Sequence, residues 1–423
     1  MDIRELGPGD DPGALLDLSV RAFGPIARAD RPRWQDITSA AMGAGQYLGA
    51  YERGQLAAAA RYHDMIQWWH GRPLPMAGVA NVMVAPEERG RGTGRALMRA
   101  LLGLISDRGY PISVLYPATL ALYRSLGWEI AGGMGQLTIP SRALRSLAAP
   151  DPAVPRDDPP GPEPRLRRCG PADAPRVLAV LGRVHQALRD CGPNTRDESA
   201  TARWLGDEHR FAYLAPGGFL AYRWQHGNEE LLVERAVASS PATTRAIWGM
   251  VASHSSIAQT VRASAGPADP VQWLTTDPDV RLSSRKAWML RVVDAAAAVA
   301  GRGFPAGIEL TTVLRLADPD RPAHDGWWTL DVGGSKGTLA PAGPAAAGLA
   351  SAGTTPLAHG PLAPGRHTSA APLALGPRGF AALYAGTPLA TLRRAGLAAG
   401  GDPSGDAALD AAFGADPFLL EFF

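Results

Sequence analysis

Hydrophobic and polar residues follow two rhythms along the first 140 residues of the chain. Alternation at every second position predicts β-strands, whereas apolar residues three or four positions apart predict amphipathic α-helices. The strands predicted in this way are residues 2–6, 47–52, 55–64, 77–85 and 111–116. The predicted helices are residues 12–23, about 93–105 and 120–126, the last ended by Gly127. Strands and helices that interleave like this indicate an α/β (α+β) fold.

A proline-rich stretch separates this region from the next one. Prolines stand at positions 150, 152, 155, 159, 160 and 162, and so many prolines cannot join a helix or the interior of a sheet. We therefore predict a linker over residues 146–163. It divides a first domain, residues 1–145, from a second domain, residues 164–302, and residues 303–423 are predicted as a third.

The second predicted domain opens like the first. Residues 165–174 form a strand-like segment followed by Gly-Pro-Ala-Asp-Ala, and a helical pattern then continues to about Leu188. The same order is found over residues 2–23, which indicates an internal duplication. Near the end of this domain, residues 288–294 read as a strand that enters a helix.

The third predicted domain has a different character. Residues 307–316 and 327–332 read as strands, and residues 333–370 are rich in Gly, Ala, Pro and Ser, which predicts long loops. The last residues, 417–423, are mostly large and apolar. Because exposed chain ends are usually polar, we expect this tail to be docked against the protein.

Composition narrows the classes of function. The chain has 42 basic and 40 acidic residues and no block of like charges, which argues against a nucleic-acid partner. Its two cysteines are too few for a disulfide framework or a four-cysteine zinc site, and we expect no metal. Without a signal-peptide pattern or a run of 18 apolar residues, we expect a cytoplasmic protein with no membrane partner.

The segment between the strand at 77–85 and the helix at 93–105 carries the most informative chemistry. Amides at a helix start have no internal partner and lie at the positive end of the helix dipole, so they suit a pyrophosphate. Glycines let phosphate oxygens approach the backbone, and arginines add positive charge. The residues expected to contact a cofactor that carries such a pyrophosphate are Arg89, Gly90, Arg91, Gly92, Thr93, Gly94 and Arg95.

Two other phosphate loops do not fit this segment. No Gly-Lys-Ser/Thr ends it, so it is not a Walker A loop, and its glycines do not match the G-x-G-x-x-G spacing of a dinucleotide fold. A plain glycine-rich turn with a solvated basic face is the simpler alternative. A further motif, Gly-Gly-Ser-Lys-Gly at 333–337, fits the nucleophile elbow of hydrolases, but residues 338–344 cannot begin a helix, so we do not expect a hydrolase.

The pattern Arg89-x-x-Gly92-x-Gly94, after a Val-x-Val-x-Pro strand, resembles the coenzyme A loop of the GNAT acetyltransferases. The resemblance implies acetyl-CoA as cofactor. It also implies that the backbone of Val82, Met83 and Val84 pairs with the pantetheine arm, with Ala118 and Thr119 as further cofactor contacts. Downstream, Leu122-Tyr123-Arg124-x-x-Gly127 is similar to the family's tyrosine motif, in which Tyr123 is the general acid that protonates the leaving thiolate.

The whole chain resembles the enhanced-intracellular-survival (Eis) family of these enzymes. Its marks, beyond the loop and the tyrosine, are Trp288-x-x-Arg291-x-x-Asp294 and the terminal Phe423. The resemblance implies two tandem GNAT-type domains, the second without a coenzyme A loop, and a third domain similar to sterol carrier proteins. It also implies that the α-carboxylate of Phe423 is the general base, and that the protein is a homohexamer.

The acceptor is the least determined part of the sequence. The resemblance implies direct transfer, in a ternary complex, to a polyamine-like acceptor, either an aminoglycoside-type antibiotic or a lysine side chain. Trp34, Glu421 and Phe422 are the residues expected to bind it. Other residues left open as bases or as cleft residues are Asp30, Asp36, His63, Asp64, Trp68, Trp69, His70, Ala80 and Asn81. Two alternatives to the enzyme are a non-catalytic coenzyme A- or lipid-binding regulator and a structural partner protein.

Overall fold

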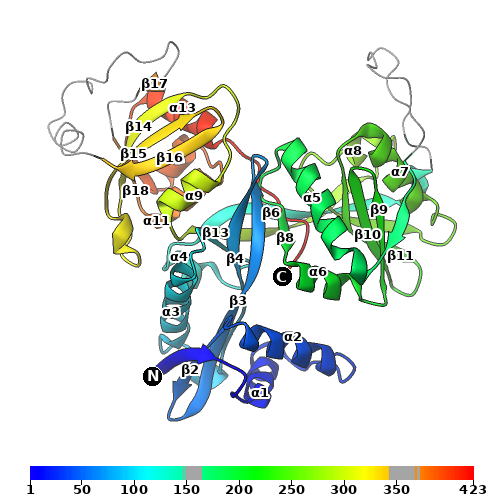
Figure 1. The fold of residues 1–423 in the computed structure, drawn as a ribbon, viewed down its shortest axis with the longest axis horizontal. Helices are drawn as coiled ribbons and strands as arrows, with labels where there is room; N and C mark the ends of the chain where they lie inside the picture. Colours follow the sequence, from blue (N-terminus) through cyan, green and yellow to red (C-terminus); the bar gives the residue numbers. More distant parts are fainter. Residues whose placement is uncertain (146, 148–163, 343–366, 369–371) are drawn as a thin grey trace.

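The structure is a computed structural model that describes residues 1–145, 147, 164–342, 367–368 and 372–423. Its strands form a 13-stranded and a six-stranded sheet. In Figure 1 the N-terminal elements (blue to cyan) lie at the bottom and centre. The next part (green) lies to the right, and the C-terminal sheet with its helices (yellow to red) lies at the upper left. Except for residue 147, the predicted linker at 146–163 falls outside the described residues.

The first part of the large sheet has the predicted interleaving of strands and helices. Its strands are β1 (Asp2–Leu6), β2 (Tyr47–Glu52), β3 (Gln55–Trp69), β4 (Arg72–Val84) and β5 (Ile112–Leu115). Its helices are α1 (Pro12–Phe23), α2 (Arg31–Gly43), α3 (Thr93–Asp107) and α4 (Leu120–Arg124), with the short turn η1 (Pro86–Glu88). The apolar stripe of α3 packs on one face of the sheet, and α1 and α2 cover the other.

Two features go beyond the hydrophobic pattern. The β3–β4 hairpin continues to the pair Trp69–Arg72, because His70 and Gly71 both adopt positive φ and close a two-residue turn. Helix α2 was not predicted. It buries only Thr38, Ala41 and Met42, so it lacks the broad apolar stripe that marks a helix in a sequence.

One strand of the large sheet comes from far along the chain. β13 (Arg281–Val292) lies between β5 and β6 (Glu129–Pro140) and is antiparallel to both. On its other edge β6 pairs with β12 (Thr260–Ala265). One continuous sheet therefore runs through both of the first two predicted domains.

The second part of the chain repeats the α/β arrangement. Its remaining strands are β7 (Arg167–Cys169), β8 (Asn194–Arg196), β9 (Arg210–Ala215), β10 (Gly218–Gln225) and β11 (Glu230–Ala238). Its helices and turns are η2 (Ser141–Leu144), η3 (Pro171–Asp173), α5 (Ala174–Leu188), α6 (Glu198–Leu205), α7 (Pro241–Ala252) and α8 (Val271–Leu274). The short strand β8 pairs with β3 rather than with its own neighbours, so it joins this part to the first.

The third part builds the second sheet, in the order β16-β15-β14-β18-β19 with β17 beside β14. Its strands are β14 (Leu310–Leu316), β15 (Gly326–Gly333), β16 (Lys336–Pro341), β17 (His367–Thr368), β18 (Leu373–Leu375) and β19 (Ala398–Gly400). Its helices and turn are α9 (Ala295–Gly301), η4 (Pro322–His324), α11 (Pro377–Tyr384), α12 (Leu389–Arg394) and α13 (Pro403–Phe413).

The expectation of long loops over residues 333–370 is wrong for its first part. Residues 336–341 are strand β16, which pairs with β15 across the turn Gly334-Ser335. Both turn residues have positive φ, as a two-residue hairpin turn requires. Ser335 therefore sits between two strands and not at the strand-to-helix turn of a hydrolase nucleophile. Residues 343–366 and 369–371 lie outside the described residues.

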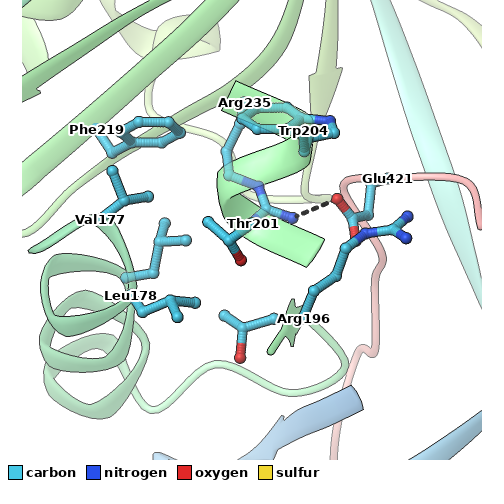
Figure 2. Close-up of a pocket in the computed structure, with 10 residues that line it drawn as sticks. Val177, Leu178, Arg196, Thr201, Trp204, Phe219, Arg235 and Glu421 are labelled. Carbon is cyan, nitrogen blue, oxygen red and sulfur yellow. Dashed lines mark hydrogen bonds and ion pairs between the residues drawn. The ribbon is translucent and has the colours of Figure 1, made fainter. Parts of the chain in front are cut away.

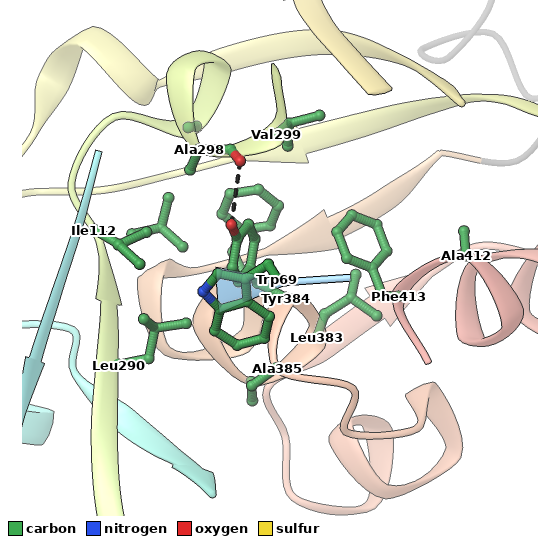
Figure 3. Packing of buried hydrophobic residues seen from close by; sticks show 14 of the residues in the cluster. Trp69, Ile112, Leu290, Ala298, Val299, Leu383, Tyr384, Ala385, Ala412 and Phe413 are labelled. Atoms are coloured by element: carbon green, nitrogen blue, oxygen red, sulfur yellow. Dashed lines mark hydrogen bonds between the residues drawn. The ribbon is translucent and has the colours of Figure 1, made fainter. Parts of the chain in front are cut away.

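The third part is joined to the first by a common apolar core. Trp69, at the end of β3, packs edge-on against Tyr384 of α11 with ring centroids 5.0 Å apart (Figure 3). The Tyr384 hydroxyl donates to the Ala298 carbonyl oxygen over 3.1 Å. Because Leu290 of β13 and Phe413 of α13 belong to the same buried cluster, the long hairpin and the C-terminal helices pack as one body.

The C-terminal tail, residues 417–423, leaves this body and crosses to the junction of the first two parts (Figure 1). The Phe418 amide donates to the Cys191 carbonyl, and the Leu419 amide donates to the Gly133 carbonyl. Two glycines make room: a Cβ on Gly132 would lie 2.1 Å from the Pro417 oxygen, and one on Gly192 would lie 2.5 Å from the Phe418 oxygen. The expectation of a docked tail is therefore confirmed.

Candidate active site

The start of α3 presents a row of unpartnered amides. Gly92 is the N-cap residue, and no side chain caps the helix. Within the described part of the chain, no acceptor is recorded for the amides of residues 90–95. Such amides, at the positive end of a 15-residue helix, form an anion site.

The glycines of this segment keep the space above the amides open. Gly90 and Gly92 have φ angles of 78° and 86°, a conformation that residues with a Cβ rarely adopt. A Cβ added to either residue would meet no atom within 4 Å, so nothing of the protein covers them. The helix start therefore fits the diphosphate of coenzyme A.

The three arginines of the segment are exposed and stand beside these amides. Arg89 donates from Nε to the Val84 carbonyl over 3.3 Å, and Arg91 pairs with Glu88 at 3.4 Å. For Arg95 no ion pair is recorded among the described residues. Exposed guanidinium groups held this loosely are available to phosphate oxygens.

Strand β4 offers a free edge next to the anion site formed by the amides of residues 90–95, which we call the cradle. It pairs with β5 only from Met76 to Val79, so residues 80–84 keep β3 on one side and no β5 partner on the other. Asn81 adopts a positive φ of 50° at the bulge in the β3–β4 ladder. The predicted cofactor residues Val82, Met83 and Val84 lie on this open stretch, and the exposed Ala118 and Thr119 follow β5 on the opposite side of the opening.

Tyr123 lies on α4, and this helix approaches the start of α3. A Cβ on Gly94 would lie 3.3 Å from Val84 Cγ2 and 3.9 Å from Leu122 Cδ2, so strand, loop and α4 converge there. Tyr123 is 5% exposed, and burial raises the pKa of its hydroxyl above the usual 10. The hydroxyl has no hydrogen-bond partner recorded in the described part of the chain. A buried phenol that stays protonated and unpaired can donate a proton to a bound group.

The end of the tail closes the site from the face opposite α3. The Phe423 ring covers Gly78 of β4, where a Cβ would lie 2.8 Å from Phe423 Cε2. Its centroid lies 6.1 Å from the His63 ring and 5.5 Å from the Tyr116 ring. Phe422 is 55% exposed and packs against Tyr116 at 4.6 Å. The structure thus places Phe423 beside the last residues that β4 and β5 share.

Glu421 holds the tail in a buried charge network. Its carboxylate accepts from Arg196 Nε and Asn194 Nδ2, each at 3.0 Å, and pairs with Arg235 at 3.3 Å (Figure 2). Its backbone carbonyl accepts from the Tyr116 hydroxyl at 2.9 Å. Burial raises the pKa of this carboxyl, but the two arginines outweigh burial and hold it below its usual value.

Trp34, which was expected to bind the acceptor, and several residues left open by the sequence lie away from the Phe423 ring. Trp34 is half-buried in the cluster of α1, α2 and the end of β4. His70 binds the Gly414 carbonyl at 2.9 Å, and burial lowers its pKa to about 4. Asp64 is exposed on β3, and Trp68 is buried against His185 of α5. Within the described part of the chain, none of these four side chains is in ring contact with Phe423, whereas His63 is.

Two residues near the tail were missed by the sequence analysis. Tyr116 follows a buried strand, and only the tertiary fold shows that it contacts Phe422, Phe423 and Glu421. Arg61 is 7% exposed and follows four consecutive alanines on β3. A charged residue inside an apolar strand is the one signal in the sequence that pointed to it.

The described residues were compared with what a membrane-spanning helix and a metal site require. No helix among residues 1–145, 164–342 and 372–423 has the length and the apolar character needed to cross a membrane. In the same ranges, no three His, Cys, Asp or Glu side chains gather where they could hold a metal ion.

Comparison with known proteins gives consistent matches. The family model described as "Acetyltransferase (GNAT) domain" matches residues 2–131, and a second model of the same description matches residues 192–292. A solved structure, a GCN5-related N-acetyltransferase from Kribbella flavida, is 40% identical with a TM-score of 0.86, over 100% of this chain and 98% of that one.

Two curated relatives are more distant in sequence. An uncharacterised N-acetyltransferase from Streptomyces avermitilis is 28% identical over 79% of this chain and 83% of its own length. The N-acetyltransferase Eis from Mycobacterium tuberculosis is 28% identical over 64% of this chain and 69% of its own length.

Proposed function

This chain belongs to the GCN5-related N-acetyltransferases and is Eis-like, and on that premise we propose that it transfers the acetyl group of acetyl-CoA to an amine. The observation that carries the proposal is the row of unpartnered amides over residues 90–95 beneath open space. When bound, acetyl-CoA supplies the acetyl group as a thioester, which is activated for attack by an amine. Val82, Met83 and Val84 would hold the cofactor along the free edge of β4, and Ala118 and Thr119 would flank it.

The reaction needs two proton transfers, and we assign each of them to a different residue beside the opening between β4 and β5. Tyr123 is the proposed general acid, because burial keeps its hydroxyl protonated. The α-carboxylate of Phe423 is the proposed general base, which takes a proton from the acceptor ammonium directly or through a water. Support for it is the position of Phe423 over Gly78. We propose direct transfer in a ternary complex, with α1, α2 and the tail on the acceptor side.

His63 is the second possible base. Burial, together with the nearby Arg61 and Arg196, lowers the pKa of His63 well below 6.5, so the ring is neutral at pH 7. Its Nε2 lies 2.8 Å from Arg61 Nη2, so its lone pair is already engaged. This contact favours Phe423 over His63.

The polyamine-like acceptors implied by the family, aminoglycoside-type antibiotics and lysine side chains, form the first screen. Thiol release from acetyl-CoA is measured with each, together with heat on titration with coenzyme A. Cofactor heat without thiol release from any amine would favour the regulator over the enzyme. We also propose a cytoplasmic homohexamer, for which light scattering after gel filtration gives the mass.

The cofactor cradle is tested by one matched pair of variants on the same segment. Gly92→Ala puts a Cβ into the open space above the amides at a positive φ, and we expect it to weaken coenzyme A binding about tenfold or more. Gly103→Ala, in the middle of α3 with open space around it, is expected to bind like the parent protein. Equal affinities for the two variants, or no heat with the parent protein, would overturn the proposal.

A further inference from the structure

An arginine that forms no ion pair with a described residue lies on the acceptor side of the sheet. Arg61 and His63 are two residues apart on β3, so both point to the face covered by α1 and α2. Arg61 Nη2 lies 2.8 Å from His63 Nε2, while Arg61 Nε is buried and has no partner within the described residues. The Phe423 ring packs against His63, which is two residues after Arg61 on the same strand. The arginine therefore lies close to the point where the acceptor must enter.

The groups packed around this arginine do not neutralise it. Tyr47 of β2 places its ring 5.6 Å from the guanidinium, and Asn81 binds the Tyr47 hydroxyl at 3.2 Å. Burial lowers the pKa of Arg61, Tyr47 raises it, and Arg196 and Arg203 lower it further. No ion pair of Arg61 with a carboxylate is recorded among the described side chains. The nearest acid of the tail, Glu421, already pairs with two arginines.

A second cation stands on the other side of the tail. Lys286 of β13 places Nζ 3.7 Å from the centre of the Phe422 ring and 5.4 Å from that of Tyr116. No carboxylate partner of Lys286 is recorded in the described part of the chain. Of the side chains near Phe422 and Phe423, Arg61 and Lys286 thus have no carboxylate side chain paired with them among the described residues; the α-carboxylate of Phe423, proposed above as the base, is a separate negative charge.

This charge distribution selects among amines. A buried cation without a partner is costly, and a carboxylate at hydrogen-bond distance removes that cost. A guanidinium also matches a carboxylate with paired N–H donors, whereas an acceptor with several ammonium groups is repelled. We propose that the acceptor is an amine that carries a carboxylate, and that Arg61, next to His63, binds this carboxylate.

The inference rests on the proposed function and narrows its acceptor. The reaction it describes is R–NH3⁺ plus CH3CO–S–CoA giving R–NH–CO–CH3, HS–CoA and one proton. The amine nitrogen forms the new bond to the acetyl carbon, and the carbon–sulfur bond breaks. The acceptor carboxylate does not react; it only sets the position of the amine.

Lysine and cadaverine provide the test, because they differ only by the carboxylate. We expect the parent protein to use lysine with a kcat/KM at least about tenfold above that of cadaverine, the effect of one charge-assisted hydrogen bond. Arg61→Met should bring this ratio to about one, and Arg61→Lys should restore part of it. Arg176→Met, an exposed arginine of α5, should keep the parent ratio.

Three outcomes would overturn the inference. One is a parent protein that prefers cadaverine or spermidine to lysine. Another is an Arg61→Met protein that loses kcat equally with lysine and cadaverine, because Arg61 would then serve the chain's own terminal carboxylate. A third is an unchanged ratio in a folded Arg61→Met protein.

A second measurement covers the case in which Arg61→Met does not fold. Hexanoate carries the carboxylate without the amine and should inhibit the parent protein competitively against lysine, whereas hexanamide should not. Equal inhibition by both compounds would overturn the inference. If coenzyme A binds but none of lysine, cadaverine and spermidine releases thiol, the proposed function fails; if only the polyamines release thiol, this inference alone fails.

Discussion

At the scale of single residues, the site depends on two groups that burial holds in one protonation state. Tyr123 is kept as a phenol, because burial raises the pKa of its hydroxyl above 10. His63 is kept neutral, because burial and two arginines lower its pKa. Neither group is expected to change its charge between pH 7 and 9.

Replacing Tyr123 tests the first of these groups. Tyr123→Phe removes the proposed acid but keeps the ring, and we expect kcat to fall about 100-fold or more with little change in coenzyme A affinity. In the parent protein no loss of rate from this tyrosine is expected below about pH 10. Stopped-flow thiol release against pH measures both effects. Tyr213→Phe, on β9 in the second part, is the matched control, and equal rates in the two variants would contradict the assignment.

Some residues of the site could be predicted from the sequence, and others could not. The glycines and arginines of residues 89–95 follow a local pattern, and the same residues form the open cradle in the structure. Arg61 is marked in the sequence only as a charged residue after four alanines of an apolar strand, and Tyr116 carries no such mark. The contacts of Tyr116 with the tail, and the position of Arg61 and His63 beside the Phe423 ring, come from segments far apart in the sequence.

At the scale of elements, the tail combines its backbone hydrogen bonds and buried leucines with one buried ionised side chain. Glu421 is 14% exposed and faces Arg235, which is 7% exposed. Removing the negative charge leaves Arg235 buried with the Asn194 carbonyl as acceptor but without its paired carboxylate, which is costly. The tail should therefore dock only while Glu421 is ionised.

Glu421→Gln tests this element. We expect a loss of about 3 kcal/mol in the free energy of unfolding, together with faster proteolysis of the tail and lower kcat. Asp416→Asn, at an exposed position directly before the tail, is the control and should change little. Denaturant unfolding and limited proteolysis give the two readouts. A Glu421→Gln protein with parent stability and turnover would show that the charge network does not hold the tail.

The same network sets a pH dependence. The pKa of Glu421 in the folded protein lies below its ordinary value, so its stabilisation is complete above the unfolded pKa of about 4.3. It is lost as the pH falls through the lower, folded value. Tail docking should therefore persist from pH 8 to pH 5 and fail only below about pH 4, as proteolysis at each pH can show.

At the scale of the whole molecule, the first α/β unit is completed by a strand from another region. Met289, Leu290 and Val292 of β13 are fully buried between β5 and β6. A fragment of residues 1–145 lacks this strand, so β5 and β6 would expose unpaired edges and apolar side chains.

We therefore expect the fragment 1–145 to aggregate or remain unfolded when it is produced alone. Co-expression with residues 164–423 should restore a soluble complex, because β13 then returns to its place. Circular dichroism and gel filtration of the fragment and of the complex provide the measurement. A fragment that folds alone and binds coenzyme A would show that β13 is dispensable.

The sequence alone determined most helices and strands of the first α/β unit, though not α2 or β6, together with the glycine and arginine positions of the anion cradle and the family, because each follows from patterns within a few dozen residues. It also indicated a docked tail, because large apolar residues are costly in water. Only the tertiary structure decided that β13 lies between β5 and β6, that the tail ends over Gly78, and that Arg61 has no ion pair with any described residue. The first two depend on contacts between residues more than 140 positions apart. The third depends on the charges that several elements bring to one point, which a local pattern does not encode.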